Sequence, residues 1–270
     1  MPREPFMFPG FFMLSKNRIS YIRSLKMKKY RERHRQFVAE GSKLVIDLLQ
    51  SRYIINWIYA IDEWLEKYGT LLEMKHIPFS PVTETIMERI TALSTHGLVL
   101  AVVDIPDISL DIAIVENELI LALDDIRDPG NLGTIVRLAD WFGIGTILCS
   151  GTTVDIYNPK AIQATMGSVA RVDVIYGNLA AFLVNASSLS TIYGTFLEGE
   201  SIYSADLESH GILVIGNESN GISEHVQKLI QRKLFIPSFQ KEQGQGGHPE
   251  SLNVSVAAAI ACSEFRRRKI

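Results

Sequence analysis

The stretch that decides the fold runs from Ile212 to Gly221 and reads Ile-Leu-Val-Ile-Gly-Asn-Glu-Ser-Asn-Gly. Four apolar residues that end at a glycine are typical of a strand buried in a parallel sheet. A second run, Leu-Phe-Ile-Pro at 234–237, leads through a polar loop to Ser251-Leu252-Asn253 and a small-residue helix at 254–262. Ligands of open α/β sheets bind at the carboxyl ends of strands, so the polar residues after each run are candidates for a functional site.

Working outward, the same alternation of apolar runs and helical patterns fills the chain from residue 119 onward. Strands are predicted at 119–123, 146–149, 172–176, 191–196, 212–215 and 234–236. Helices are predicted between and after them, at 132–142, 159–166, 179–187, 223–232 and 251–268. Regular alternation of this kind predicts an α/β domain at 119–270, with a mostly parallel sheet covered by helices on both faces.

The first part of the chain predicts a smaller α/β domain at 13–105. Helical spacing runs from Ser15 to Leu49, interrupted by a short strand at 37–41. Strands at 54–60, 77–79 and 99–103 alternate with helices at 62–68 and 81–93. A linker rich in Asp, Pro and Ser is expected at 106–118. Residues 1–12 carry three prolines and no small-residue cleavage site, so we expect a poorly ordered extension rather than a signal peptide.

Charge is distributed unevenly along the chain. The net charge of the 270 residues is −3, which gives no global signature of nucleic-acid binding. Between Lys16 and Arg35, however, nine Lys or Arg side chains accompany one acidic residue, Glu32. Solvated charged faces usually mix both signs, so this stretch favours phosphate contacts over a merely solvated surface, which stays the alternative. The candidates for RNA contacts are Lys16, Arg18, Arg23, Lys26, Lys28, Lys29 and Arg31.

The sequence lacks the signals of several other classes of protein. The two cysteines, Cys149 and Cys262, lie in apolar segments and are predicted to be buried thiols. No Cys or His spacing indicates a metal site, so none is expected. No run of eighteen apolar residues predicts a transmembrane helix. Neither a G-x-G-x-x-G nor a phosphate-loop motif follows a strand, which argues against an unrelated doubly wound nucleotide enzyme.

Three ordered motifs resemble the signatures of one family. The first is Asn131-Leu-Gly-Thr-Ile-Val-Arg137, the second is the stretch 212–221, and the third joins 234–237 to Ser251-Leu252-Asn253. Together, these motifs resemble the SpoU (TrmH) family of RNA 2′-O-ribose methyltransferases. The smaller domain is similar to that family's substrate-binding domain. The resemblance implies S-adenosylmethionine as cofactor, structured ribosomal or transfer RNA as partner, a homodimer and a deep trefoil knot near the carboxyl end. A cytoplasmic location is expected by default, because neither a signal peptide nor a transmembrane helix is predicted.

The resemblance also implies roles for individual residues. The implied catalytic residues are Arg137, Asn131, Glu218, Ser251 and Asn253, and the implied cofactor-binding residues are Thr195, Gly216, Ile236 and Leu252. Whether Arg137 acts as a base or as an electrostatic stabiliser stays open. On pattern alone, Asn131 could be a helix cap and the segment 216–221 a simple turn. An Arg within the apolar helix pattern around position 137 would need a partner if it were buried.

The sequence differs from the family pattern at one place, and one alternative function remains open. Ser238 replaces the family's usual Met, and the loop 239–249 is several residues longer than usual, which puts cofactor affinity in question. The rival is a catalytically inactive RNA-binding protein of the same fold. The presence of all five implied catalytic residues favours the enzyme.

Overall fold

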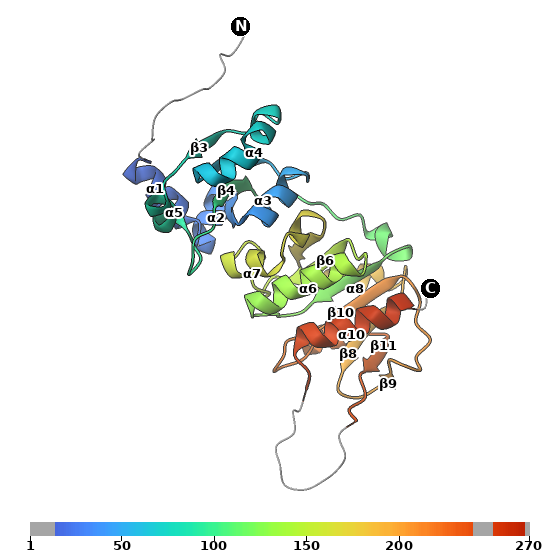
Figure 1. Ribbon diagram of the computed structural model, residues 1–270. Coiled ribbons are helices and arrows are strands. Elements are labelled where there is room, and N and C mark those ends of the chain that lie inside the picture. Colours follow the sequence, from blue (N-terminus) through green and yellow to red (C-terminus); the bar gives the residue numbers. More distant parts are fainter. Residues whose placement is uncertain (1–13, 240–250, 268–270) are drawn as a thin grey trace. The chain divides into compact units, whose positions relative to one another are not determined.

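The computed structural model describes residues 14–239 and 251–267 (Figure 1). The expected extension at 1–12 and nearly all of the long loop 239–249 therefore lie outside the described residues. The chain divides into two units, the first ending at Pro106 and the second starting at Asp107.

The first unit is a four-stranded mixed sheet with helices packed on it. The strand order is β1 (Gln36–Glu40), β4 (Val99–Asp104), β2 (Ile55–Ala60) and β3 (Phe79–Pro81). Its helices are α1 (Lys16–Ser24), α2 (Lys28–His34), α3 (Ser42–Leu49), α4 (Asp62–Met74) and α5 (Glu84–Ile90). One face of the sheet buries Val38, Tyr59 and Leu100 against apolar residues of α1 and α5.

The basic stretch corrects the prediction of a continuous helix. The chain turns at 25–27, between α1 and α2, and the side chain of Arg31 explains the turn. Arg31 as a whole is 2% exposed, and its guanidinium donates hydrogen bonds to the carbonyl oxygens of Leu25 (2.9 Å) and Lys26 (2.7 Å), just after the end of α1. Carbonyl groups at a helix end lack partners within the helix, and a basic side chain satisfies them well. Arg31 is therefore a buried capping residue, and its predicted RNA contact is wrong.

The second unit contains a seven-stranded sheet in which every pair of neighbours is parallel, which confirms the predicted sheet. Its strands are, in spatial order, β7 (Asp173–Gly177), β6 (Thr146–Ser150), β5 (Leu119–Leu123), β10 (Gly211–Ile215), β8 (Ile192–Phe196), β11 (Arg232–Phe235) and β9 (Glu200–Ser201). Every residue of β5, β6 and β10 is buried, as continuous apolar runs predict.

Helices cover both faces of this sheet. One face packs against α8 (Leu179–Ala186), α9 (Glu224–Gln227) and the 3₁₀ helix η1 (Ile112–Glu116). Figure 1 shows α6 (Pro129–Trp141) beside α10 (Val254–Arg267), and α7 (Pro159–Ala164) also packs on α6. A short 3₁₀ turn, η2, spans Ser168–Ala170. The expected linker 106–118 is only partly a linker, because Val115 of η1 is fully buried in the core.

The topology of the sheet indicates where a ligand would bind. From β5 the chain proceeds to β6 and β7 on one side, and later to β8, β10 and β11 on the other. The strand order therefore reverses next to β5, and ligands of open α/β sheets bind beyond the carboxyl ends of strands at such a point. Cys149 and Cys262 are buried free thiols, as predicted. Within the described ranges, no helix is both long and apolar enough to span a membrane.

Candidate active site

The first motif starts α6 immediately after β5. Asp128, not Asn131, is the N-cap of this helix, because its Oδ1 accepts a hydrogen bond from the backbone N–H of Asn131 at 2.8 Å. Pro129 occupies the first turn, where a missing N–H costs nothing. The alternative of Asn131 as a helix cap is therefore wrong, and its side-chain amide is available for other partners.

The amide of Asn131 joins all three motifs. Its Nδ2 donates to Oε1 of Glu218 at 2.5 Å, and its Oδ1 accepts from Nδ2 of Asn253 at 3.1 Å. These partners lie 87 and 122 residues further along the chain. Asn253 is fixed in turn, because its Oδ1 accepts from the backbone N–H (2.9 Å) and the hydroxyl (2.6 Å) of Ser255 at the start of α10. Three of the five predicted catalytic residues thus form one network.

The loop between β10 and α9 is held rigidly in place. A Cβ added to Gly216 would lie 2.3 Å from the carbonyl carbon of Gly221, so the glycine is needed for close backbone approach rather than for a positive φ. Asn217 donates from Nδ2 to the carbonyl oxygen of Asp125 at 2.8 Å, and its Oδ1 accepts from the N–H groups of Ser219 and Asn220. The loop is therefore more than a simple turn, and it presents Glu218 to α6.

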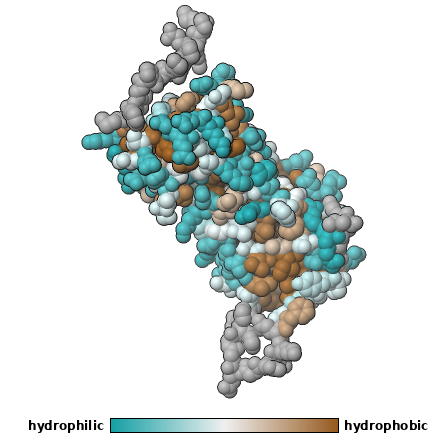
Figure 2. Space-filling model, viewed as in Figure 1, coloured by the Kyte–Doolittle hydropathy of each residue, from teal (hydrophilic) through white to brown (hydrophobic). Residues whose placement is uncertain are grey.

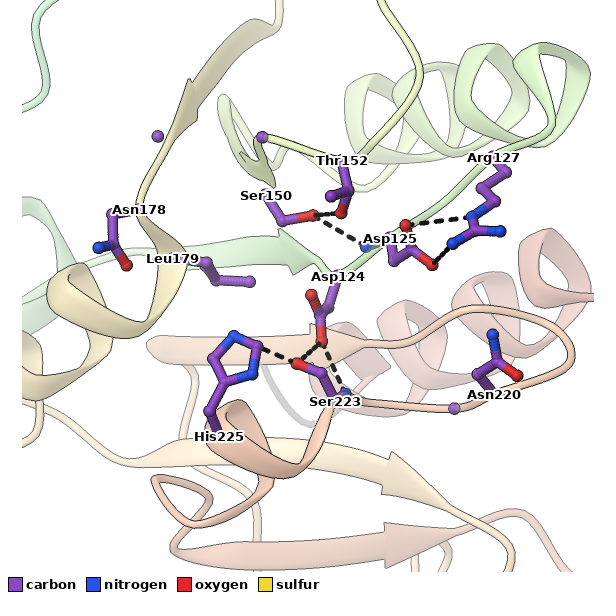
Figure 3. Close-up of a pocket in the computed structure, with 13 residues that line it drawn as sticks. Asp124, Asp125, Arg127, Ser150, Thr152, Asn178, Leu179, Asn220, Ser223 and His225 are labelled. Atoms are coloured by element: carbon purple, nitrogen blue, oxygen red, sulfur yellow. Dashed lines mark hydrogen bonds and ion pairs between the residues drawn. The ribbon is translucent and has the colours of Figure 1, made fainter.

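A buried aspartate that the sequence analysis missed anchors the far end of this loop. The carboxylate of Asp124 is 4% exposed, and its Oδ2 accepts from the backbone N–H (2.8 Å) and the hydroxyl (2.6 Å) of Ser223. Figure 3 shows this pair beside His225, whose Nε2 lies 3.4 Å from the same hydroxyl. Polar residues directly after a predicted strand were the available signal, and Asp124 directly follows the strand 119–123.

Arg137 and Ser251 lie outside the network. Six residues along an α-helix correspond to a rotation of about 240°, so Arg137 faces a different side of α6 from Asn131. Its side chain is exposed and makes no hydrogen bond or ion pair with a described residue, so it is not a buried arginine in need of a partner. Ser251 is also exposed. No cluster of three His, Cys, Asp or Glu side chains able to hold a metal occurs in residues 14–239 and 251–267.

Three of the four predicted cofactor residues lie at the carboxyl ends of neighbouring strands. Thr195 is near the end of β8, Gly216 follows β10 and Ile236 follows β11. In the described part of the chain, no hydrogen bond satisfies the backbone N–H or C=O of Gly216 or Ile236, although Gly216 is buried. Buried backbone groups require partners, so these positions suit a polar ligand. Leu252, the fourth residue, is 47% exposed.

In the first unit, the remaining basic candidates differ in exposure. Lys16, Arg23, Lys26, Lys28 and Lys29 are exposed. Arg18 is half-buried, because its Nε donates to the hydroxyl of Tyr59 at 2.5 Å and its guanidinium lies over the ring of Trp57, 5.5 Å from the centroid. The protein itself therefore engages much of the Arg18 side chain. Of the five exposed cations, Lys28 lies 3.8 Å from Oε1 of Glu32, in an ion pair that is itself exposed to solvent.

Comparison with known proteins agrees with this geometry. Residues 118–263 match the model of the SpoU rRNA Methylase family, and residues 16–101 match the MRM3-like substrate binding domain. The 23S rRNA (guanosine(2553)-2′-O)-methyltransferase of Bacillus subtilis is 30% identical over 90% of this chain and 94% of its own length.

Solved structures give the same result. A TrmH-family protein from Porphyromonas gingivalis is 36% identical, with a TM-score of 0.81 over 95% of this chain and 100% of that one. An AdoMet-bound rRNA methyltransferase from Sinorhizobium meliloti is 29% identical, with a TM-score of 0.81 over 96% of this chain and 97% of that one.

Proposed function

Because this chain belongs to the SpoU rRNA methylase family, we propose that its substrate is the RNA of the large ribosomal subunit. Its reaction is the transfer of a methyl group from S-adenosylmethionine to a ribose 2′-hydroxyl of RNA. The proposal of ribosomal rather than transfer RNA rests on the similarity of the whole chain to a relative named for 23S rRNA. A protein that acts on this substrate is located where ribosomes are made. In a bacterial cell this is the cytoplasm.

We propose that Thr195, Gly216, Ile236 and Leu252 hold the cofactor. When bound, S-adenosylmethionine supplies an electrophilic methyl group on a positively charged sulfur. The unsatisfied backbone groups of Gly216 and Ile236 can hydrogen-bond its polar parts. Leu252, at 47% exposure, and the half-buried Ile236 offer apolar contact to a ring system.

The single observation that carries the catalytic proposal is the bond of Asn131 to both Glu218 and Asn253. Side chains from three distant segments are held in fixed positions beside the proposed cofactor residue Gly216, and fixed geometry is the main contribution a protein makes to a transfer of this kind. We propose that this network, with Ser251, positions the ribose. Arg137 then stabilises the negative charge that develops as the hydroxyl loses its proton, or assists that loss.

A methylation assay tests the substrate and the reaction together. Ribosomal RNA and transfer RNA from a strain that lacks the gene are each incubated with the protein and labelled S-adenosylmethionine. We expect label in 23S rRNA at a single ribose, found by mapping 2′-O-methyl sites, and none in transfer RNA. Label in transfer RNA alone would contradict the substrate. Binding of S-adenosylhomocysteine without any transfer would favour the inactive RNA-binding protein.

We further propose that the first unit, residues 13–105, grips the RNA with its exposed lysines and Arg23. The excess of positive charge on α1, α2 and the turn between them, where Glu32 is the single acidic residue, suits a phosphate backbone. The match of residues 16–101 to a substrate binding domain supports this assignment. The second unit, from residue 119 on, then carries catalysis.

We also propose that two copies of the chain associate through α6 and α10. Trp141, the last residue of α6, is 83% exposed, and Val256 on α10 is 47% exposed. Figure 2 shows hydrophobic residues gathered over the region of α10. An exposed apolar patch on a helix pair is typical of an interaction surface. The proposed dimer would also bring Arg137, on the same helix as Trp141, close to the interface.

The family resemblance supports a trefoil knot between β11 and α10. After β11 the chain crosses to α10, where Arg266 donates hydrogen bonds to the carbonyl oxygens of Phe142 and Gly143 beyond the end of α6. We propose that α10 is reached through the loop between β8 and β10. An experimental trace in which the chain reaches α10 from outside that loop would contradict the knot.

A further inference from the structure

A pocket of about 450 Å³ lies at the carboxyl ends of β5, β6, β7 and β10. The proposed cofactor residues lie at the ends of β8, β10 and β11, so the pocket occupies the adjoining half of the same edge of the sheet. Its size falls within the usual range for small-molecule sites, roughly 300–1,000 Å³. Neither the proposed cofactor residues nor the Asn131 network accounts for it.

Two exposed glycines line this pocket. Gly151 follows β6 and Gly177 ends β7, and both line the pocket. A Cβ added to either one would meet no atom within 4 Å, and neither has a positive φ that would require glycine. The space beside them is therefore not needed for packing of the protein itself.

The polar groups around the opening suit a base better than an ion. Figure 3 shows Asn178 on one flank and Asn220 on the other, with Asp124 between them. The Oδ1 of Asn178 caps α8 by accepting from the N–H of Ala181 at 3.1 Å, which leaves its Nδ2 available. The side chain of Asn220 is exposed and makes no hydrogen bond with a described residue. Side-chain amides match the donor and acceptor edges of nucleobases.

The two aspartates at the pocket do not make it a cation site. Asp124 uses its Oδ2 to hold Ser223, and Asp125 forms an ion pair with Arg127 at 3.0 Å. The charge of Asp125 is therefore balanced within the protein, that of Asp124 is stabilised by two hydrogen bonds from Ser223, and the other described residues of the lining include no carboxylate.

The loop from Gly216 to Gly221 separates the pocket from the Asn131 network. Glu218 reaches Asn131 on α6, whereas Asn220 and Gly221 line the pocket. Asn217 ties the same loop to the backbone of Asp125. The network and the pocket are therefore lined by residues of the same short loop.

We propose that this pocket receives the base of the methylated nucleotide, turned out of its stack, and that Asn178 and Asn220 read its edge. The inference rests on the proposed function. Enzymes that do chemistry on a base extrude that base into a fitted pocket, which also selects it. A pocket beside the ribose site would select the base of the target nucleotide in the same way. The cofactor and the base would then occupy neighbouring halves of one sheet edge, with the ribose between them.

The first test fills the pocket. Gly177→Leu and Gly151→Leu place a side chain in the open space, and Gly145→Leu is the matched control. Gly145 also has room for a Cβ, but it precedes β6 at the opposite edge of the sheet. We expect the two pocket variants to lower kcat/KM for methyl transfer to ribosomal RNA by about 100-fold, because misplacement of the ribose removes the aligned geometry. Calorimetric affinity for S-adenosylhomocysteine should stay within about twofold, and the control should behave as wild type.

Two other results would contradict the proposal that a base enters the pocket. Normal methylation by the filled variants would show that no base enters. Loss of S-adenosylhomocysteine binding together with activity would assign the space to the cofactor. The wild-type arm separates this inference from the proposed function: if wild-type protein labels no RNA, the function fails, whereas a defect confined to the filled variants concerns the pocket.

The second test leaves the pocket open and replaces the amide side chains that are proposed to contact the base. Asn178→Ser retains a side chain that can cap α8 but shortens the reach of the amide. Synthetic RNA fragments carry each of the four bases at the mapped position. We expect wild type to prefer one base and Asn178→Ser to narrow that preference by about tenfold, the scale of one specific base contact. An unchanged preference in both Asn178→Ser and Asn220→Ser would overturn the assignment even if the filled variants were unstable.

Discussion

At the scale of single residues, the motif glycines have structural explanations that the sequence alone does not reveal. A Cβ on Gly133 would lie 2.4 Å from the carbonyl oxygen of Ala161 and 2.6 Å from Cβ of Ala164. The glycine in the first motif therefore lets α6 and α7 pack closely. Its neighbours Asn131 and Arg137 carry the chemistry, and the glycine sets where their helix lies.

This explanation predicts opposite effects of the same substitution at two helical glycines. Gly133→Ala should lower the free energy of unfolding by about 1–3 kcal/mol, because the added methyl group overpacks the contact with α7. Gly69→Ala, in the middle of α4, should raise it by about 0.5–1 kcal/mol, because its Cβ would meet nothing within 4 Å and alanine favours the helix. Urea unfolding followed by circular dichroism measures both. Equal effects at the two positions would contradict the packing explanation.

Arg137 is the residue whose role depends most on the family resemblance. Arg137→Ala should lower the rate of methyl transfer by at least about 100-fold, the scale of losing one transition-state donor. Affinity for S-adenosylhomocysteine should change by no more than a few-fold, because Arg137 is not among the residues proposed to hold the cofactor. Arg137→Lys should recover part of the rate if charge alone matters, but not if a planar, two-pronged grip is needed.

Lys160→Ala is the control for this experiment, since Lys160 is an exposed cation on the neighbouring helix α7. It should methylate RNA at the wild-type rate. Near-normal single-turnover methylation by Arg137→Ala would show that the essential group lies elsewhere.

At the scale of elements, sequence patterns locate strands better than they locate helix ends. The strands at 119–123 and 146–149 match β5 and β6 to within one residue, because fully buried strands are continuous apolar runs. The two-residue β9 is too short to leave a pattern. The break between α1 and α2 depends on the tertiary hydrogen bonds of Arg31, and a run of like charges does not show which cation turns inward.

The sequence predicted some residues of the candidate site and missed others. The resemblance of three motifs to one family singled out Asn131, Glu218 and Asn253, and the structure brings these three side chains together. Asp124 and Asn217 were missed, since their partners are backbone groups about a hundred residues away. Arg137 lies outside the network because six residues along α6 turn its side chain to a different side of the helix from Asn131. The motif groups the two residues together and does not show this difference in direction.

The exposed basic residues of α1, α2 and the turn between them lead to a prediction about salt. Replacing Lys26, Lys28 and Lys29 with Ala should weaken RNA binding and reduce the slope of log affinity against log salt by up to about 0.9 for each lost phosphate contact. Affinity for S-adenosylhomocysteine should not change. Lys67→Ala with Lys75→Ala, two exposed cations of the same unit, is the control and should leave the slope unchanged. RNA binding at low salt that is unaffected by the triple substitution would mean that this face is only solvated.

At the scale of the whole molecule, the two units divide the work that the reaction requires. The first unit has a mixed four-stranded sheet and an exposed basic face, whereas the second has a fully parallel sheet whose carboxyl edge holds the Asn131 network. Binding energy from contacts remote from the reacting atoms can be used to position the ribose. Substitutions in the first unit should therefore act on RNA affinity, and those at the sheet edge on the rate of transfer.

The proposed dimer gives the last prediction. Trp141 at 83% exposure and Val256 at 47% are costly to leave in water, and burying them against a second copy would remove that cost at the helix pair α6 and α10. Trp141→Lys places a charge on this surface and should convert a dimer into a monomer at micromolar concentration, as measured by sedimentation. Val184→Lys is the matched control, because Val184 is 55% exposed on α8, which covers the opposite face of the sheet, and it should leave assembly unchanged. Because Arg137 shares α6 with Trp141, the monomeric variant should also lose methyl transfer while it retains S-adenosylhomocysteine binding. A wild-type protein that sediments as a monomer would exclude the dimer, and a Trp141→Lys monomer with full activity would show that the active site is complete within one chain.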